Sequence, residues 1–314
     1  MWILYVLLAL VTLFFAVTFV CFRLTFYVTD NQKQPKTEYD IPDGDIYEPY
    51  RDRMVQWIKE TRALPCREIT IQSADGLNLR GKFYEYDENA PIELMFPGYR
   101  GRAERDLCGG VQRCFSLGYS VLLVEQRACG VSDGHVITFG IKESDDCIRW
   151  AQLLKEQYPD RPVMLTGVSM GAATVLAAAG KTLPDNVVAV LADCGFTSAK
   201  DIICKVLRDI KLPPALVYPF IKWGAKLYGG FDLEETSPLE AVKRSPVPIL
   251  FIHGENDAFV PCEMSVRNFE ACTADKRLFT VKDAGHGLAY LVDRDGYVDT
   301  LKSFRETHIK KTVS

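Results

Sequence analysis

The sequence predicts an α/β fold, in which helices cover both faces of a mostly parallel sheet. Short apolar runs are continuous instead of alternating, as expected for strands that are buried on both faces. Helix-like stretches lie between these runs. A Gly-x-Ser-x-Gly segment joins one strand to the next helix. The 314 residues, of which 48% are hydrophobic, suffice for a large core.

The first two predicted strands, residues 68–72 and 78–86, alternate between apolar and polar side chains. They are joined through Asp75-Gly76, a dipeptide that closes hairpins, so we expect an antiparallel pair at the start of the sheet. The continuous runs that follow are predicted to complete a mostly parallel, eight-stranded sheet. They comprise residues 92–96, 121–124, 163–168, 187–192, 249–253 and 278–281.

Helix-like stretches separate the predicted strands. They comprise residues 46–64, 103–117, 143–158, 171–181, 262–273 and 296–308. One interval between strands is much longer than the usual connection, because about fifty residues are inserted at about 195–247. We expect two short apolar helices there, split at Pro213-Pro214. We interpret this insertion as a small helical lid over a pocket, with an ordinary side layer as the alternative.

Residues 1–28 are predicted to be a transmembrane anchor. Trp2 to Phe22 contains no charged residue, and about 21 helical residues are enough to cross roughly 30 Å of hydrocarbon. A cleaved signal peptide is the alternative, but its basic n-region and small-residue cleavage site are missing. Basic residues after the span and unpaired cysteines favour a single-pass protein with its body on the cytoplasmic side. Residues 29–45 are interpreted as a polar tether, and residues 46–314 as the folded domain.

The composition argues against two classes of function. A net charge of -4, from 37 basic and 41 acidic side chains, provides no basic field for nucleic acid. The 10 cysteines are scattered singly and only 4 histidines accompany them, so neither a zinc site nor a disulfide framework is indicated. We expect no metal and no organic cofactor.

Ser169 is the predicted catalytic nucleophile. It lies in Gly167-Val168-Ser169-Met170-Gly171, after a predicted strand and before a predicted helix. In this context Gly-x-Ser-x-Gly forms a tight turn that holds the serine out of the sheet. The flanking glycines let strand and helix approach closely, and the helix N-terminus favours developing negative charge.

A serine nucleophile requires a base, and His286 is the preferred candidate. It lies in a glycine-flanked loop just after the last predicted strand, where the ring can reach the edge of the sheet. His308 falls on the terminal helix, and His135 lies in a loop near the expected opening of the site. His253 ends an apolar strand and is interpreted as a structural histidine.

Asp257 is the predicted carboxylate that orients His286. It directly follows the predicted strand 249–253, and the next strand leads to His286. Of the candidate carboxylates, Asp257 is therefore expected to have the shortest distance to the imidazole. Glu255 and Asp193 are competing carboxylates. The chain order of the predicted triad is Ser, Asp, His.

The backbone N–H groups of Met170 and Tyr99 are predicted to stabilise an oxyanion. Met170 follows the nucleophile, and Tyr99 lies in the loop after the strand 92–96. We expect four further residues near the substrate, namely Arg100, His135, Phe196 and Val260.

With these elements, the chain resembles the α/β-hydrolase superfamily from about residue 68 to residue 308. Besides the serine turn, residues 125–134 resemble the family's D-x-R-G-x-G-x-S segment, and residues 257–261 resemble its D-x-x-V-P acid loop. Within the superfamily the chain resembles the membrane-anchored serine hydrolases of the bacterial YqkD type, akin to the serine aminopeptidase (S33) and acyl-thioesterase branches. Two features depart from the pattern. Pro97 stands where many relatives have histidine, and Glu125 and Cys129 replace aspartate and histidine.

The residues and the resemblance together lead us to expect a membrane-anchored serine hydrolase. The apolar insertion and the anchor favour an ester or thioester substrate with a hydrocarbon portion, either a small molecule or a lipid. A peptidase that uses the same triad is one alternative, and a catalytically silent membrane scaffold is another.

Overall fold

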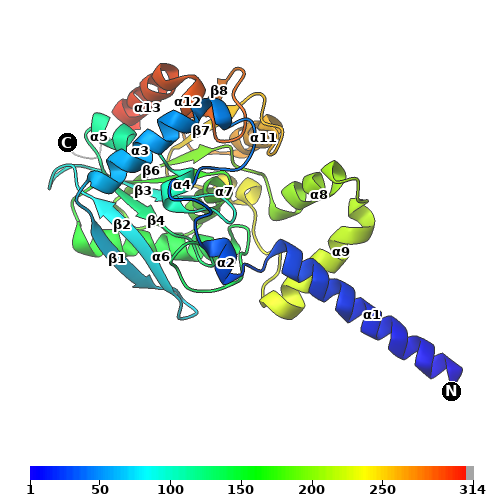
Figure 1. The fold of residues 1–314 in the computed structure, drawn as a ribbon. Coiled ribbons are helices and arrows are strands. Elements are labelled where there is room, and N and C mark those ends of the chain that lie inside the picture. Colours follow the sequence, from blue (N-terminus) through cyan, green and yellow to red (C-terminus); the bar gives the residue numbers. More distant parts are fainter. Residues whose placement is uncertain (309–314) are drawn as a thin grey trace.

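An eight-stranded sheet runs through the centre of the molecule in the computed structural model, which describes residues 1–308 (Figure 1). The strands follow one another across the sheet in the order β1-β2-β4-β3-β5-β6-β7-β8. Their bounds are β1 Arg67–Gln72, β2 Asn78–Tyr84, β3 Ile92–Phe96, β4 Ser120–Val124, β5 Val163–Val168, β6 Val187–Asp193, β7 Ile249–Gly254 and β8 Lys276–Val281. Strands β1 to β2 and β2 to β4 pair antiparallel, and the remaining neighbours pair parallel. The predicted fold class is confirmed.

Helices cover both faces of the sheet (Figure 1). The longer ones are α1 Trp2–Thr25, α3 Arg51–Ala63, α5 Gly110–Ser116, α6 Ile141–Gln157, α7 Met170–Ala179, α8 Ala199–Asp209, α9 Pro214–Gly224, α11 Cys262–Ala271 and α13 Arg294–His308. Single turns are α2 Asp30–Lys33, α4 Ala103–Asp106, α10 Pro238–Ala241, α12 Ala289–Val292, η1 Glu48–Tyr50, η2 Ala225–Gly229 and η3 Val242–Arg244. One apolar core packs helices α6 and α7 on the sheet, and another packs α5 and α13 on the opposite face.

The stretch predicted as one helix over residues 103–117 is broken into α4 and α5. Gly109 lies between them with a positive φ of 83°, a conformation that glycine adopts without steric strain. A Cβ on this residue would lie 2.6 Å from the Trp57 ring. The break therefore lets α3 pack closely against this part of the domain.

The residues interpreted as a polar tether lie on the domain. Asp40 accepts a hydrogen bond from Arg102 at 2.6 Å, and Ile41 is buried in an apolar cluster with Tyr47, Met54 and Ile58. This segment is therefore in close contact with the body, although the boundaries of the predicted domains remain predictions.

The insertion forms helices α8 and α9, which are separated at Pro213-Pro214 as predicted. Helix α9 packs along α1 (Figure 1), with the Phe14 ring against the rings of Phe220 and Trp223. Helix α1 is long and apolar enough to cross a membrane, with only a small part of it buried. The apolar faces of α9 and α1 thus contact each other. A lid function for the insertion remains a prediction.

Candidate active site

Ser169 lies in a sharp turn between β5 and α7. Its φ of 57° is unusual for a residue other than glycine and is typical of strain at functional turns. The turn is tight, because a Cβ on Gly167 would lie 2.1 Å from the backbone of Gly171. A Cβ on Gly171 would likewise lie 2.1 Å from the carbonyl oxygen of Phe96. Both glycines are therefore required by close backbone contacts, as the Gly-x-Ser-x-Gly pattern predicts.

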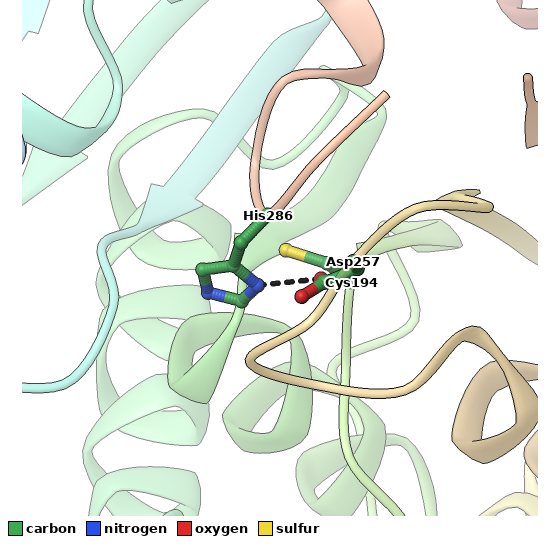
Figure 2. A group of neighbouring side chains, drawn as sticks. All are labelled: Cys194, Asp257 and His286. Atoms are coloured by element: carbon green, nitrogen blue, oxygen red, sulfur yellow. Dashed lines mark hydrogen bonds and ion pairs between the residues drawn. The ribbon is translucent and has the colours of Figure 1, made fainter. Parts of the chain in front are cut away.

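Folding brings Ser169, His286 and Asp257 into one line of hydrogen bonds. The Ser169 hydroxyl lies 3.0 Å from Nε2 of His286. Nδ1 of the same ring lies 2.6 Å from Oδ2 of Asp257, the contact drawn in Figure 2. With Nδ1 carrying the proton, Nε2 is free to accept the serine proton. These contacts are the geometry that a serine, a base and an orienting carboxylate require.

The Asp257 carboxylate is buried and has a full set of hydrogen bonds. Oδ1 accepts the backbone N–H groups of Phe259 at 2.9 Å and Val260 at 2.8 Å, while Oδ2 accepts His286 and lies 3.2 Å from Nε2 of His253. Burial by itself raises the pKa of this carboxyl. The hydrogen bonds from His253 and His286 outweigh that effect and hold the pKa of Asp257 well below its usual range. Asp257 is therefore ionised at neutral pH.

His253, interpreted from the sequence as a structural residue, is fully buried beside Asp257. Its Nδ1 lies 2.6 Å from the Ser265 hydroxyl, and its Nε2 lies 2.8 Å from the carbonyl oxygen of Val260. A proton on Nε2 satisfies both the Val260 carbonyl and the Asp257 carboxylate, and Ser265 then donates to Nδ1. His253 thus contacts the loop of residues 257–261 from the interior of the domain and stabilises its conformation.

The loop after β3 is held by side chains from two other segments. Nε2 of Gln126 donates to the carbonyl oxygen of Pro97 at 2.7 Å, and Oδ2 of Asp106 accepts the N–H of Gly98 at 2.9 Å. These bonds fix the loop although Pro97 replaces the histidine of many relatives. A Cβ on Gly98 would lie 3.5 Å from the Ser169 Cβ, so the loop lies beside the serine. The backbone N–H groups of Tyr99 and Met170 donate no hydrogen bond to any of the described residues.

The same loop contacts the end of helix α1. The Tyr99 hydroxyl donates to the carbonyl oxygen of Thr25 at 2.6 Å. The Arg100 guanidinium donates to the carbonyl oxygens of Leu24 at 2.9 Å and Tyr27 at 3.1 Å. Helix α1 is therefore hydrogen-bonded to residues next to the candidate nucleophile.

A cavity of about 630 Å³ opens at Ser169 and His286. Residues 42–47 form part of its wall, and the Tyr47 hydroxyl donates to the carbonyl oxygen of His286 at 3.0 Å. Of the residues expected near the substrate, Arg100 lines this cavity. Among the residues that the structure describes, the cavity wall contains no residue of the insertion 195–247, and it omits His135, Phe196 and Val260.

Those last three residues pack elsewhere. His135 stacks on Tyr27, with ring centroids 5.4 Å apart, and its Nδ1 lies 2.9 Å from the carbonyl oxygen of Val28. Phe196 and Val260 are buried in an apolar cluster with Met170. The expectation that these three residues contact the substrate therefore stays a prediction.

Cys194 was not predicted to lie at the site, yet its sulfur lies within 4.8 Å of ligand atoms of Asp257 and His286 (Figure 2). These three residue types can hold a metal, but the thiol must first lose its proton. Burial raises the pKa of Cys194 well above its ordinary value. The Asp257 oxygens already accept hydrogen bonds from four donors, so the arrangement favours a hydrogen-bonded group of side chains over a metal centre.

Comparison with known proteins agrees with this fold. The model of the prolyl oligopeptidase family matches residues 138–312, more than half of the chain. The chain belongs to the prolyl oligopeptidase family. It is also a member of the α/β-hydrolase superfamily, which confirms the resemblance that the motifs indicated.

This family member is 32% identical to YqkD of Bacillus subtilis over 190 residues, a match that covers 60% of this chain but only 62% of the relative. Its fold is similar to that of the Pyrococcus furiosus esterase Pf2001, with a TM-score of 0.63, 22% identity and coverage of 79% of this chain and 93% of the esterase. It is also similar to the Pyrococcus horikoshii acylaminoacyl peptidase, with a TM-score of 0.58, 18% identity and coverage of 79% and 42% of the two chains. At these identities the two structures are evidence for the fold alone.

Proposed function

We propose that this chain is a serine hydrolase with Ser169 as nucleophile, His286 as general base and Asp257 as the residue that orients the imidazole. The observation that supports this most directly is the continuous line of hydrogen bonds from Ser169 through His286 to an ionised Asp257. The strained turn at Ser169 and the family membership support the same reading.

In the proposed reaction, the Ser169 hydroxyl oxygen attacks an acyl carbonyl carbon while His286 accepts its proton at Nε2. The carbonyl electron pair moves to the oxygen, where the N–H groups of Met170 and Tyr99 are proposed to stabilise the charge. The pair returns as the bond to the leaving group breaks, and His286 gives its proton to that group. Water then attacks the acyl-enzyme, again with His286 as base, and releases the acid and the free serine.

For the substrate we propose a carboxylic ester or thioester with a hydrocarbon portion. The cavity at Ser169 has apolar walls from Met54, Met95, Leu107 and Phe259 besides its polar groups. The exposed apolar side chains of α1 and of α9 lie on the same side of the domain, so we further propose that α1 anchors the enzyme in a membrane. A lipid-like substrate would then be available at the membrane surface.

A fluorophosphonate probe applied to the purified full-length chain tests the proposed nucleophile. We expect the probe to label the unmutated chain and Ser303→Ala, whose serine is exposed on α13, and to leave Ser169→Ala unlabelled. The physical reason is that only a serine activated by a base reacts with the probe at a useful rate. Absence of labelling in the unmutated chain would favour the silent scaffold instead.

A serine peptidase is the second candidate, and the family membership favours it. The same triad attacks esters and amides, so the site geometry is compatible with both reactions. The rates of hydrolysis of esters and aminoacyl amides that carry the same acyl group distinguish an esterase from a peptidase. A higher kcat/KM for the amides would favour the peptidase.

A further inference from the structure

The cavity that contains Ser169 and His286 also reaches a group of polar side chains that the proposed reaction does not use. These are Arg113 on α5, Thr166 on β5, Asp193 at the end of β6 and Tyr290 on α12. We name them the polar chamber. The backbone links the chamber to the nucleophile, because the N–H of Ser169 donates to the carbonyl oxygen of Asp193 at 2.9 Å.

The polar chamber contains hydrogen-bonding atoms that have no partner among the described residues. They are Nη1 of Arg113, Oγ1 of Thr166, Oδ1 of Asp193 and the hydroxyl of Tyr290. The first three residues are only 3%, 1% and 4% exposed. Nε of Arg100, elsewhere in the wall of the same cavity, also has no partner among the described residues. Buried polar groups are nearly always paired in folded proteins, so these unpaired atoms along a single cavity indicate that something else pairs with them.

The position of Thr166 supports this interpretation. Successive side chains of β5 point to opposite faces, and the neighbours of Thr166 on its own face are Met164 and Val168, which both pack with the apolar core there. An apolar residue would suit that core position. A hydroxyl in its place is best explained by a polar group in the cavity.

The charges around the polar chamber select the kind of group that it can hold. Arg113 forms a buried ion pair with Glu93, so these two charges compensate each other. An anionic group would face Asp193, and a cationic group would face the unpaired nitrogen of Arg113. A neutral group with several hydroxyls can donate to Asp193, accept from Arg113 and pair in either direction with Thr166 and Tyr290.

We propose that the polar chamber binds the neutral, hydroxyl-bearing alcohol portion of an ester substrate, such as a glycerol unit, while the acyl carbonyl lies at Ser169. This inference rests on the proposed serine hydrolase function and deepens it by naming a substrate class. The hydrocarbon portion of such a substrate lies outside the chamber.

The test compares two esters of the same fatty acid, one with glycerol and one with propanol, on the full-length chain. We expect a higher kcat/KM for the glycerol ester. Thr166→Val removes one hydrogen-bonding group with little change in shape, so the ratio of the two kcat/KM values is expected to fall about tenfold. Thr166→Ser keeps the hydroxyl and is expected to keep the ratio, as is the distant control Ser303→Ala.

Other outcomes overturn the proposal. Equal kcat/KM values for the two esters in the unmutated chain, or an unchanged ratio in Thr166→Val, would mean that the chamber holds only water. A preference for an aminoethyl ester over the glycerol ester would assign the chamber to a cation. Should Thr166→Val not fold, Tyr290→Phe serves the same comparison. Fluorophosphonate labelling of Ser169 is independent of these ratios, so failure of the chamber and failure of the proposed function are distinguishable.

Discussion

The carboxylate of Asp257 depends on a residue that does not touch the candidate nucleophile. His253 contacts Asp257 and the carbonyl oxygen of Val260 from the interior of the domain, while His286 contacts the same carboxylate from the cavity side. The sequence indicated that His253 was a satisfied structural histidine, and its three buried contacts agree with that. Its place next to the acid could not be deduced from the sequence, because an apolar strand ending in His-Gly has no catalytic signal of its own.

Replacing His253 with phenylalanine is expected to reduce both stability and activity. The carbonyl oxygen of Val260 loses a buried donor, which costs about 1 to 3 kcal/mol in the free energy of unfolding. We expect kcat to fall roughly tenfold, much less than the loss of about 10⁴ typical of Asp-to-Asn changes in triads, because the Asp257 to His286 contact persists. Urea unfolding and ester hydrolysis measure the two effects. An unchanged midpoint and kcat, equal to those of a His308→Gln control, would contradict the role assigned to His253.

Asp193 is expected to make the stability of the protein depend on pH. Burial raises the pKa of this carboxyl to about 6 from an ordinary value of 3.8, although nearby histidine charge and the Tyr297 hydroxyl oppose the shift. Between these two values the unfolded chain has released a proton that the folded chain still holds, so the free energy of unfolding falls as the pH rises through this range. The contribution of Asp193 to stability is complete below about pH 4 and lost above about pH 6.

The variant Asp193→Asn is expected to remove this pH dependence. Relative to the unmutated chain, its free energy of unfolding should rise by up to about 3 kcal/mol between pH 4 and pH 7. Urea midpoints across this range provide the measurement, with the exposed Asp160→Asn as the control. A constant difference between Asp193→Asn and the unmutated chain at all pH values would show that Asp193 is not perturbed as described.

At the scale of elements, helix α1 is hydrogen-bonded to the loop after β3, which carries the Tyr99 N–H proposed to stabilise the oxyanion. The sequence predicted an anchor at residues 1–28 and a polar tether at residues 29–45, with no contact between the anchor and the loop after β3. In the structure, the carbonyl groups near the end of α1 accept hydrogen bonds from Tyr99 and Arg100. The carbonyl groups at a helix end lack partners within the helix, so side chains of a neighbouring loop can satisfy them. Contacts of this kind join residues far apart in the sequence and leave no local pattern.

Loss of these contacts is expected to slow the reaction. Arg100→Met removes the bonds to Leu24 and Tyr27 and should loosen the loop that carries the Tyr99 N–H, lowering kcat about tenfold, as expected for a misplaced oxyanion donor. Ester hydrolysis by the full-length chain in detergent provides the measurement, and the exposed Arg149→Met is the control. Equal kcat for the two variants would mean that α1 contributes attachment only.

At the scale of the whole molecule, we predict an orientation in the membrane from the charges that flank α1, the proposed anchor. Arg23 and Lys33 lie on the side of the domain, which favours a domain that faces the cytoplasm. Cys66 is exposed at the start of the domain, so it reports on this orientation directly.

We expect Cys66 to react with a membrane-impermeant maleimide in opened cells and not in intact cells. The reason is that the reagent reaches only thiols on the outer side of the membrane. Cys66→Ser identifies which part of the labelling belongs to this residue. Labelling of Cys66 in intact cells would place the domain on the outer side.

The sequence by itself determined the order of strands and helices and the candidate triad. Short, continuous runs of apolar and β-branched residues favour strands covered on both faces, and Gly-x-Ser-x-Gly between a strand and a helix has a strong local requirement for glycine. These signals are local, so they can be detected along the chain without knowledge of distant contacts.

Only the tertiary structure decided what surrounds that triad. Residues 42–47 and Tyr290 line the cavity although about 240 residues separate them in the chain. Helix α9 of the insertion packs beside α1, a contact that the sequence did not indicate. In the sequence, Thr166 is an ordinary strand residue. Its hydroxyl suggests a ligand only once the structure shows that it is buried without a partner among the described residues. The physical reason is that burial, charge and hydrogen-bond satisfaction depend on all the segments that meet at a place, and a sequence pattern records only one of them.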